Sequence, residues 1–97
     1  MKASVLGITF CDIKYHMDKW NQMKPGFELM MEREPTNPKD PNAVKVTMSE
    51  IHIGYIEKDF AKEISQRMKD HDVTHRKCKI FAIRGTPYDM PILVVEW

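Results

Sequence analysis

The chain has 97 residues, of which 42% are hydrophobic and 30% charged, with a formal net charge of +1 and a mean hydropathy of −0.49. This length supports one modest hydrophobic core, so residues 1–97 are expected to form a single domain. The balanced charge excludes the strongly basic composition of proteins that coat nucleic acid, and no apolar run is long enough to span a bilayer.

The first residues, 1–7, lack the apolar core of a signal peptide, which favours a cytoplasmic, reducing location. Cys11 and Cys78 are therefore expected to be thiols, and Cys78 in particular a small buried hydrophobe. They lack the Cys-x-x-Cys spacing typical of zinc sites. No cofactor, metal or membrane contact is expected.

In chain order, residues 4–10 contain the β-branched and aromatic residues of a strand whose side chains alternate between two faces. Apolar residues at helical spacing between positions 11 and 24 fit either a short helix or an irregular connection. Pro25-Gly26 predicts a turn, and residues 27–33 follow as a second alternating strand.

The segment from Arg33 to Val44 is dense in proline, asparagine and aspartate. Each proline fixes φ at about −65° and removes a backbone donor, and the side chains of Asn37, Asp40 and Asn42 can bond nearby backbone as Asx-turns. This pattern predicts a rigid loop that presents polar groups at little cost in ordering. The alternative is a hairpin loop that only connects two strands.

After this loop, residues 44–48 and 51–55 alternate as the two arms of a tight hairpin. Gly54 inside the second arm indicates a bulge or a close backbone approach, as occurs where a sheet curls toward a barrel. Residues 58–70 then change to a helical period, with one apolar face and an i,i+4 charge pair.

Residues 77–83 and 90–97 read as two further strands around a turn at 85–89. With five or six short strands, one clear helix and no βαβ alternation, the predicted fold is mainly β: a small OB-like antiparallel β-barrel with one or two short helices. Side chains fill the interior of a barrel this small, so function is expected on loops and an outer face.

Residues 73–88 contain four cations and no carboxylate, which gives this window a charge of +4. Such a run is either a solvated strand face or a strip that tracks phosphates. The cations are Arg76, Lys77, Lys79 and Arg84.

Several motifs follow one another along the chain in a fixed order and spacing. They are Gly7-Ile8-x-Phe10, Arg33-Glu34-Pro35, Asn37-Pro38-x-Asp40-x-Asn42-Ala43-Val44-x-Val46, Gly54-Tyr55-Ile56, Ala61 in the helix, and Met90-Pro91-Ile92. With these motifs the sequence resembles the HIRAN domain, found in SNF2-type DNA translocases that remodel stalled replication forks and as short bacterial or viral proteins. The resemblance covers nearly the whole chain and is most specific in its centre. It implies an OB-like barrel that captures single-stranded DNA at a free 3′ end.

By this resemblance, Asp40 takes the place of the acid that bonds the 3′-hydroxyl, Lys58 that of a phosphate contact, and Tyr88 that of an aromatic near the last strand. Two positions depart from the family pattern. Thr9, before Phe10, replaces an arginine, and Lys39 replaces an aromatic that offers a stacking surface. The predicted nucleic-acid-binding residues are Thr9, Phe10, Asn37, Lys39, Asp40, Asn42, Lys58 and Tyr88.

Two other function classes remain open. A protein-interaction module would dock a helicase or nuclease partner, or block a host defence component if the source is a phage, through a surface built on tryptophan or methionine. An enzyme is the weakest reading, because no nucleophile stands beside a base and the pair His71 and His75 alone is not a metal site. Oligomeric state is left open.

Overall fold

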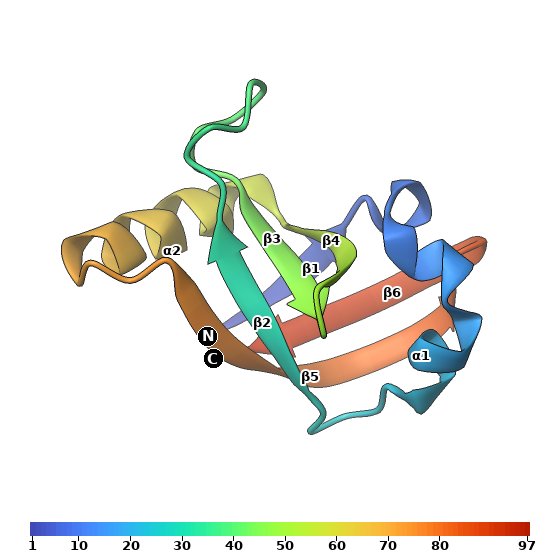
Figure 1. Cartoon of the computed structure of the whole chain (residues 1–97). Coiled ribbons are helices and arrows are strands. Elements are labelled where there is room, and N and C mark those ends of the chain that lie inside the picture. Colours follow the sequence, from blue (N-terminus) through green and yellow to red (C-terminus); the bar gives the residue numbers. More distant parts are fainter.

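Six antiparallel strands close into a barrel in the order β1, β4, β3, β2, β5, β6 in the computed structural model, which describes residues 1–97 (Figure 1). This architecture confirms the predicted OB-like barrel. The strands are Lys2–Leu6 (β1), Glu28–Arg33 (β2), Val44–Met48 (β3), Ile51–Ile56 (β4), His75–Thr86 (β5) and Asp89–Glu96 (β6). The helical segments are the 3-10 turns Ile8–Phe10 (η1) and Asp12–Tyr15 (η2) and the α-helices Met17–Gln22 (α1) and Lys58–Asp70 (α2).

Inward-facing apolar side chains fill the barrel, as expected for its size. Figure 1 shows α2 on one side of the barrel and the segment from η1 to α1 on the other. Both sides contribute to the core: Ile64 and Met68 pack from α2, and Ile13 and Trp20 pack from η2 and α1. The Trp20 indole donates a hydrogen bond of 2.9 Å to the carbonyl of Gly85, which ties α1 to β5. None of the helices has the length and apolar character needed to cross a bilayer.

Gly54 confirms the predicted bulge and close approach. The pairing of β3 with β4 shifts register between Val46 and Thr47, opposite this glycine. A Cβ atom at position 54 would lie 2.7 Å from both the Leu6 carbonyl oxygen and Val5 Cγ1. The absence of a side chain therefore allows β1 to pack against β4 here.

The first strand is shorter than the sequence pattern suggests, and the prediction of a strand over residues 4–10 is wrong beyond Leu6. Gly7 adopts φ +74°, a left-handed conformation that ends the strand and starts η1. The alternation of faces is lost with it. Ile8 is buried in the core, and Phe10 is 87% exposed.

The other elements follow the predictions closely. Between residues 11 and 24 the chain forms two short helical segments, η2 and α1, which are separated by the non-helical His16. The helix α2 has the predicted limits, and its Arg67 and Glu63 side chains form the i,i+4 ion pair at 3.0 Å. The final hairpin is longer than expected, because Gly85 and Asp89 belong to β5 or β6 and not to the turn. Both cysteines are buried free thiols, and burial raises the pKa of Cys78 to about 12.

Candidate nucleic-acid interface

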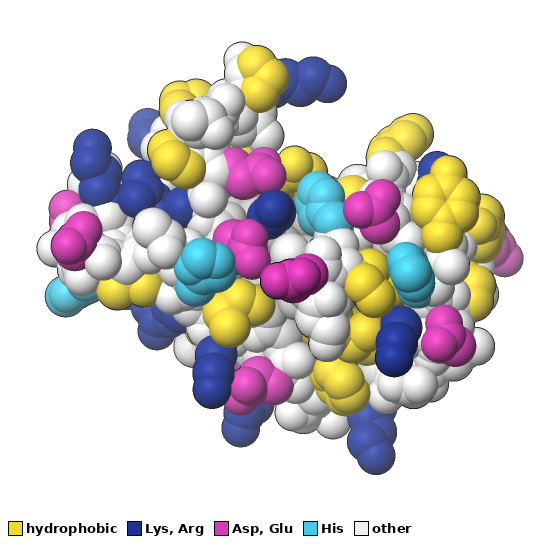
Figure 2. Space-filling view, viewed as in Figure 1, with side chains coloured by type: hydrophobic (Ala, Val, Ile, Leu, Met, Phe, Trp, Pro, Cys, Tyr) yellow, Lys and Arg dark blue, Asp and Glu magenta, His cyan; other side chains and the backbone are white.

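The largest groove, of about 780 Å³, lies between the Pro/Asn loop and η1, with β4 as its floor and the start of α2 at its side. The loop runs from Glu34 to Ala43, and the N–H of the first donates to the carbonyl of the second at 2.9 Å. In Figure 2 this loop projects from the top of the molecule and leaves a notch beside it. The groove is lined by Leu6, Gly7, Phe10, Cys11, Asn37, Pro38, Lys39, Asp40, Ala43, His52, Tyr55, Ile56, Lys58 and Ala61.

Hydrogen bonds within the loop hold its polar side chains in place. Asn37 Oδ1 accepts from the backbone N–H groups of Lys39 and Asp40 at 2.9 and 3.1 Å, and Asp40 Oδ1 accepts from the N–H of Asn42 at 2.9 Å. Two of the three predicted Asx-turns are thus confirmed, whereas the side chain of Asn42 forms no hydrogen bond. The second carboxylate oxygen of Asp40 has no protein partner, so it can accept a hydrogen bond from a ligand.

Glu34 anchors the base of the loop to the barrel. Asn37 Nδ2 donates to Glu34 Oε1 at 3.1 Å, and Lys45 Nζ lies 3.8 Å from Glu34 Oε2. Burial raises the pKa of Glu34, but hydrogen bonds from Asn37 and Tyr55 and the charges of Lys45 and His52 outweigh burial, so the net pKa is lowered. Burial together with the neighbouring Glu34 carboxylate raises the pKa of Tyr55 to about 12. The Glu34 carboxylate therefore connects the loop to Lys45 of β3 and lies near Tyr55 of β4.

The opposite wall of the groove is formed by η1. Phe10 stands at its end with 87% of its surface exposed, an uncommon position for a phenylalanine that packs against nothing. Below it, the Cys11 thiol donates to the carbonyl of Gly7 at 3.2 Å, and burial raises the pKa of this thiol. Phe10 is therefore not part of the core, and its ring is accessible to a ligand in the groove.

The start of α2 contributes one cation to the groove lining. Lys58 is the first helical residue, and Lys58 and Ala61 both line the groove. The N-cap residue Glu57 makes no side-chain hydrogen bond, so the N–H groups of the first turn have no side-chain cap. Such uncapped N–H groups favour an anion near the helix start.

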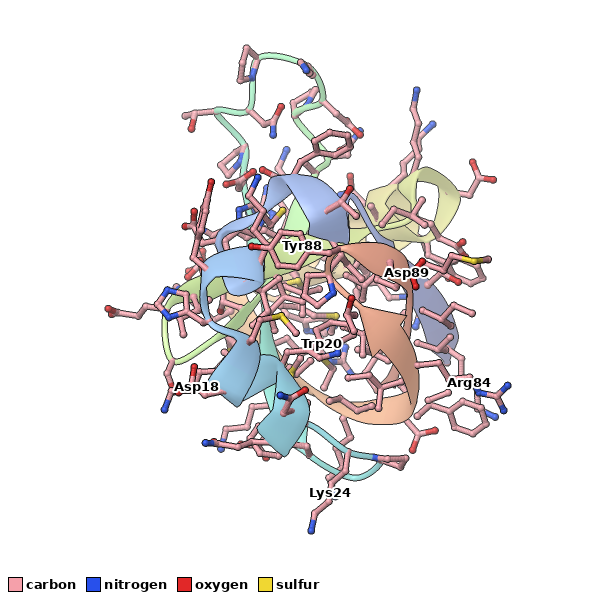
Figure 3. All side chains as sticks on the ribbon, turned by 90° about the vertical axis from the view of Figure 1, so that its right-hand side faces the viewer. Asp18, Trp20, Lys24, Arg84, Tyr88 and Asp89 are labelled. Atoms are coloured by element: carbon pink, nitrogen blue, oxygen red, sulfur yellow. The ribbon has the colours of Figure 1, made fainter.

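The groove brings together five of the eight predicted site residues and leaves three outside. Thr9 and Asn42 do not line it, and Tyr88 lies on the turn between β5 and β6. The Tyr88 hydroxyl donates to the carbonyl of Lys14 at 2.7 Å, so this ring packs beside η2 (Figure 3). The five inside are Phe10, Asn37, Lys39, Asp40 and Lys58.

Nine of the 14 residues that line the groove were not among the predicted site residues, and four of them are Leu6, Cys11, His52 and Tyr55. The His52 and Tyr55 rings meet edge to face, with centroids 4.8 Å apart. The available signal was the position of Tyr55 directly after Gly54, since a bulge reorients the side chains that follow it.

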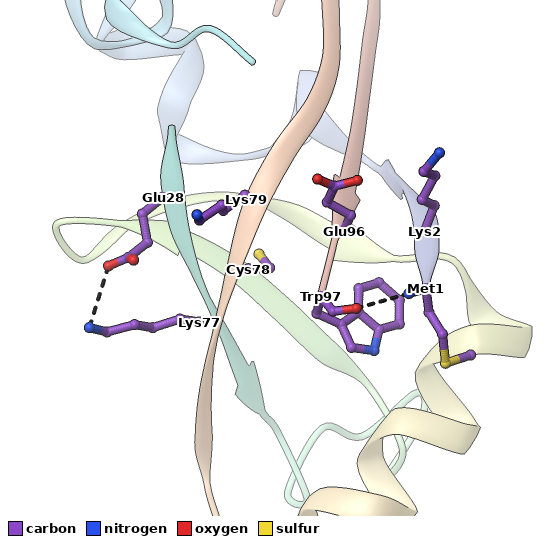
Figure 4. Close-up of a pocket in the computed structure, with 8 residues that line it drawn as sticks. All are labelled: Met1, Lys2, Glu28, Lys77, Cys78, Lys79, Glu96 and Trp97. Carbon is purple, nitrogen blue, oxygen red and sulfur yellow. Dashed lines mark hydrogen bonds and ion pairs between the residues drawn. The ribbon is translucent and has the colours of Figure 1, made fainter. Parts of the chain in front are cut away.

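A second hollow, of about 370 Å³, lies where the two chain ends meet (Figure 4). The N-terminal amine donates to the Trp97 carbonyl at 2.8 Å, and Lys77 lies 3.5 Å from Glu28. It is about half the volume of the groove, and three of its eight lining residues are hydrophobic, so it is a weaker candidate site than the groove. No group of three or more His, Cys, Asp or Glu side chains is placed to bind a metal ion.

The comparisons with known proteins agree with this architecture. The family model of the HIRAN domain matches residues 4–93. A protein from Lactobacillus plantarum of known crystal structure has a TM-score of 0.75 at 17% identity, over 97% of this chain and 88% of that chain. The HIRAN domain of human HLTF has a TM-score of 0.65 at 16% identity, over 98% of this chain and 69% of that chain. No curated protein sequence matches the chain.

Proposed function

The chain belongs to the HIRAN domain family, a family of DNA-binding modules, and on this premise we propose that it binds single-stranded DNA, without catalysis, by a free 3′ end. The observation that carries the proposal is the groove itself. It places the exposed ring of Phe10, the free oxygen of Asp40 and the ammonium of Lys58 around one space. Its volume falls in the range of roughly 300–1,000 Å³ typical of ligand sites.

Asp40 supplies the preference for a chain end. Its carboxylate accepts a hydrogen bond from a terminal 3′-hydroxyl but repels the phosphate that would follow in a continuous strand. Because Asn37 and Asn42 fix the surrounding backbone, this carboxylate is held in place before DNA arrives. Little ordering free energy is then lost on binding.

Phe10 supplies a stacking surface for a base, and Lys39 and Lys58 neutralise phosphates at the two edges of the groove. The replacement of an aromatic by Lys39 removes a second stacking surface and adds a charge. Affinity is therefore expected to be modest and to fall with salt. In the cell, we place such a module in DNA repair, replication or mobile-element biology, alongside a helicase or nuclease.

A protein-interaction adaptor is the weaker alternative. Such an adaptor would need an exposed patch of tryptophan or methionine side chains, but Trp20 and four of the eight methionines are buried. Trp97 is only partly exposed, and Met90 is the one strongly exposed methionine within the strands. These positions favour the DNA-binding proposal.

The test compares binding of short single-stranded oligonucleotides that end in a 3′-hydroxyl or a 3′-phosphate, by fluorescence anisotropy at low salt. We expect a preference for the hydroxyl on the order of tenfold or more, because like charges at an interface cost several kcal/mol. Asp40→Asn keeps the oxygen that accepts from Asn42 and should abolish the preference. Asp59→Asn, on α2 outside the groove lining, is the matched control. Equal binding of both ends by the unmodified chain would refute end recognition.

A further inference from the structure

The outer face of β1, β6 and β5 carries exposed apolar side chains that the groove does not account for. Leu6 is 53% exposed, Phe81 46% and Ile92 49%. Between them Val94 is paired with Ser4 on one side and Ala82 on the other, so these residues share one side of the sheet. We call this surface, formed by Lys2, Leu6, Lys79, Phe81, Arg84, Ile92, Val94 and Glu96, the β6 face.

Three cations and one carboxylate accompany this apolar surface, and that carboxylate, Glu96, is paired in register with Lys2 of β1 and with Lys79 of β5. The Lys2 ammonium lies 3.7 Å from the centre of the Phe81 ring, and Arg84 is paired with Ile92 in the β5–β6 ladder. Figure 3 shows Arg84 at the edge of the barrel, pointing away from it. Neither these two residues nor Lys79 lies within ion-pair distance of a carboxylate. The basic run of β5 is therefore split: Lys77 pairs with Glu28, and the cations of the β6 face are left unpaired.

The β6 face is continuous with the groove through Leu6. This side chain lines the groove, and its strand is paired with β6 at Ser4 and Val94. Leu6 follows two residues after Ser4 on β1, with its side chain on the same outer face. The loop, η1 and the start of α2 surround the rest of the groove, so the Leu6 side leads onto an open surface.

We propose that the β6 face holds the nucleotides that lie 5′ to the one in the groove, which gives the bound strand a fixed direction across β1, β6 and β5. The proposal rests on the proposed function, because a 3′ end held at Asp40 leaves only the 5′ direction for the strand. Phe81 then stacks with a base while Lys2 and Arg84 contact phosphates. Unpaired cations beside apolar side chains fit this polyanion better than a neutral protein surface.

The experiment measures affinity for 5′-labelled oligothymidylates of two and of eight nucleotides, each with a 3′-hydroxyl. The octamer is expected to bind more tightly than the dimer, and Phe81→Ala should weaken only the octamer, roughly fivefold or more. Lys79→Gln should lower the salt slope of octamer binding by about 0.7. Lys62→Gln, an exposed lysine on α2, is its matched control and should change neither. Because Lys79 is exposed, this variant tests the proposal even if Phe81→Ala folds poorly.

The possible outcomes distinguish a failure of this inference from a failure of the proposed function. If dimer and octamer bind equally and Asp40→Asn still changes end preference, the β6 face is not part of the DNA site but the groove is. If neither oligonucleotide binds at low salt, both proposals fall. If sedimentation shows a dimer that Phe81→Ala dissociates, the β6 face is a contact between copies of the chain and the inference is wrong.

Discussion

Substitution of Phe10 by alanine separates a binding role from a structural one. The ring is 87% exposed, so only 13% of its surface is buried. For a side chain of roughly 200 Å², burial of that fraction at about 25 cal/mol per Å² stabilises the fold by about 0.6 kcal/mol. Phe10→Ala should therefore leave the unfolding free energy nearly unchanged.

DNA affinity should respond much more strongly. Loss of one base-stacking aromatic costs roughly 1–3 kcal/mol, which corresponds to a fall in affinity of roughly 5- to 150-fold. Fluorescence anisotropy with a short 3′-hydroxyl oligonucleotide measures the affinity, and urea denaturation measures the stability of the same preparations. The control is Tyr15→Ala, since this ring is 72% exposed but does not line the groove.

Two results would contradict this reasoning. If Phe10→Ala binds as tightly as the unmodified chain, the ring does not stack with a base. If the variant loses more than about 2 kcal/mol of stability, Phe10 packs in solution in a way that its exposure does not reveal.

Gly54→Ala should destabilise the barrel by about 1–3 kcal/mol in urea denaturation, because the new methyl group would overlap the Leu6 carbonyl and Val5; an unchanged midpoint would show that β1 can move away. Glu34→Gln should lower the free energy of unfolding at about pH 7 but change it little at about pH 3. The reason is that a carboxyl group whose pKa is lowered in the folded state stabilises the fold above its ordinary pKa, and this stabilisation is lost as the pH falls through the folded-state pKa. An equal loss of stability at both pH values would mean that Glu34 acts only through packing. The same variant should also weaken DNA binding, because the hydrogen bond that holds the Asn37 side chain is weakened.

The sequence indicated most of the fold because its signals were local. Alternation in 44–48 and 51–55 marked a hairpin, and the apolar period of 58–70 marked α2 within its observed limits. The end of β1 was missed because glycine adopts positive and negative φ about equally well, and the apolar, β-branched residues around Gly7 favour a strand. That one dihedral angle moves Phe10 from a strand face to the rim of the groove.

The site was predictable where the contacts are close in sequence. Asn37 and Asp40 bond backbone groups two or three residues away, which the loop composition already suggested. His52 joins the groove only through pairing between strands, which the composition of a single segment does not encode. Tyr88 shows a limit of reasoning by resemblance: its position near the last strand fits the family pattern, but its hydroxyl donates to the carbonyl of Lys14 in η2 and the ring does not line the groove, so its role in binding stays a prediction.

The hydrogen bonds that shape the Pro/Asn loop join residues of the loop to one another. The barrel holds this loop at the strand pair Arg33–Val44, through the ion pair of Glu34 with Lys45, and at the buried Ala43. These ten residues can therefore be replaced as one unit. Ligand choice and barrel stability can then change separately during evolution, since a different loop sequence leaves the interior packing untouched. The same independence makes the loop a practical place to graft a new specificity onto this scaffold.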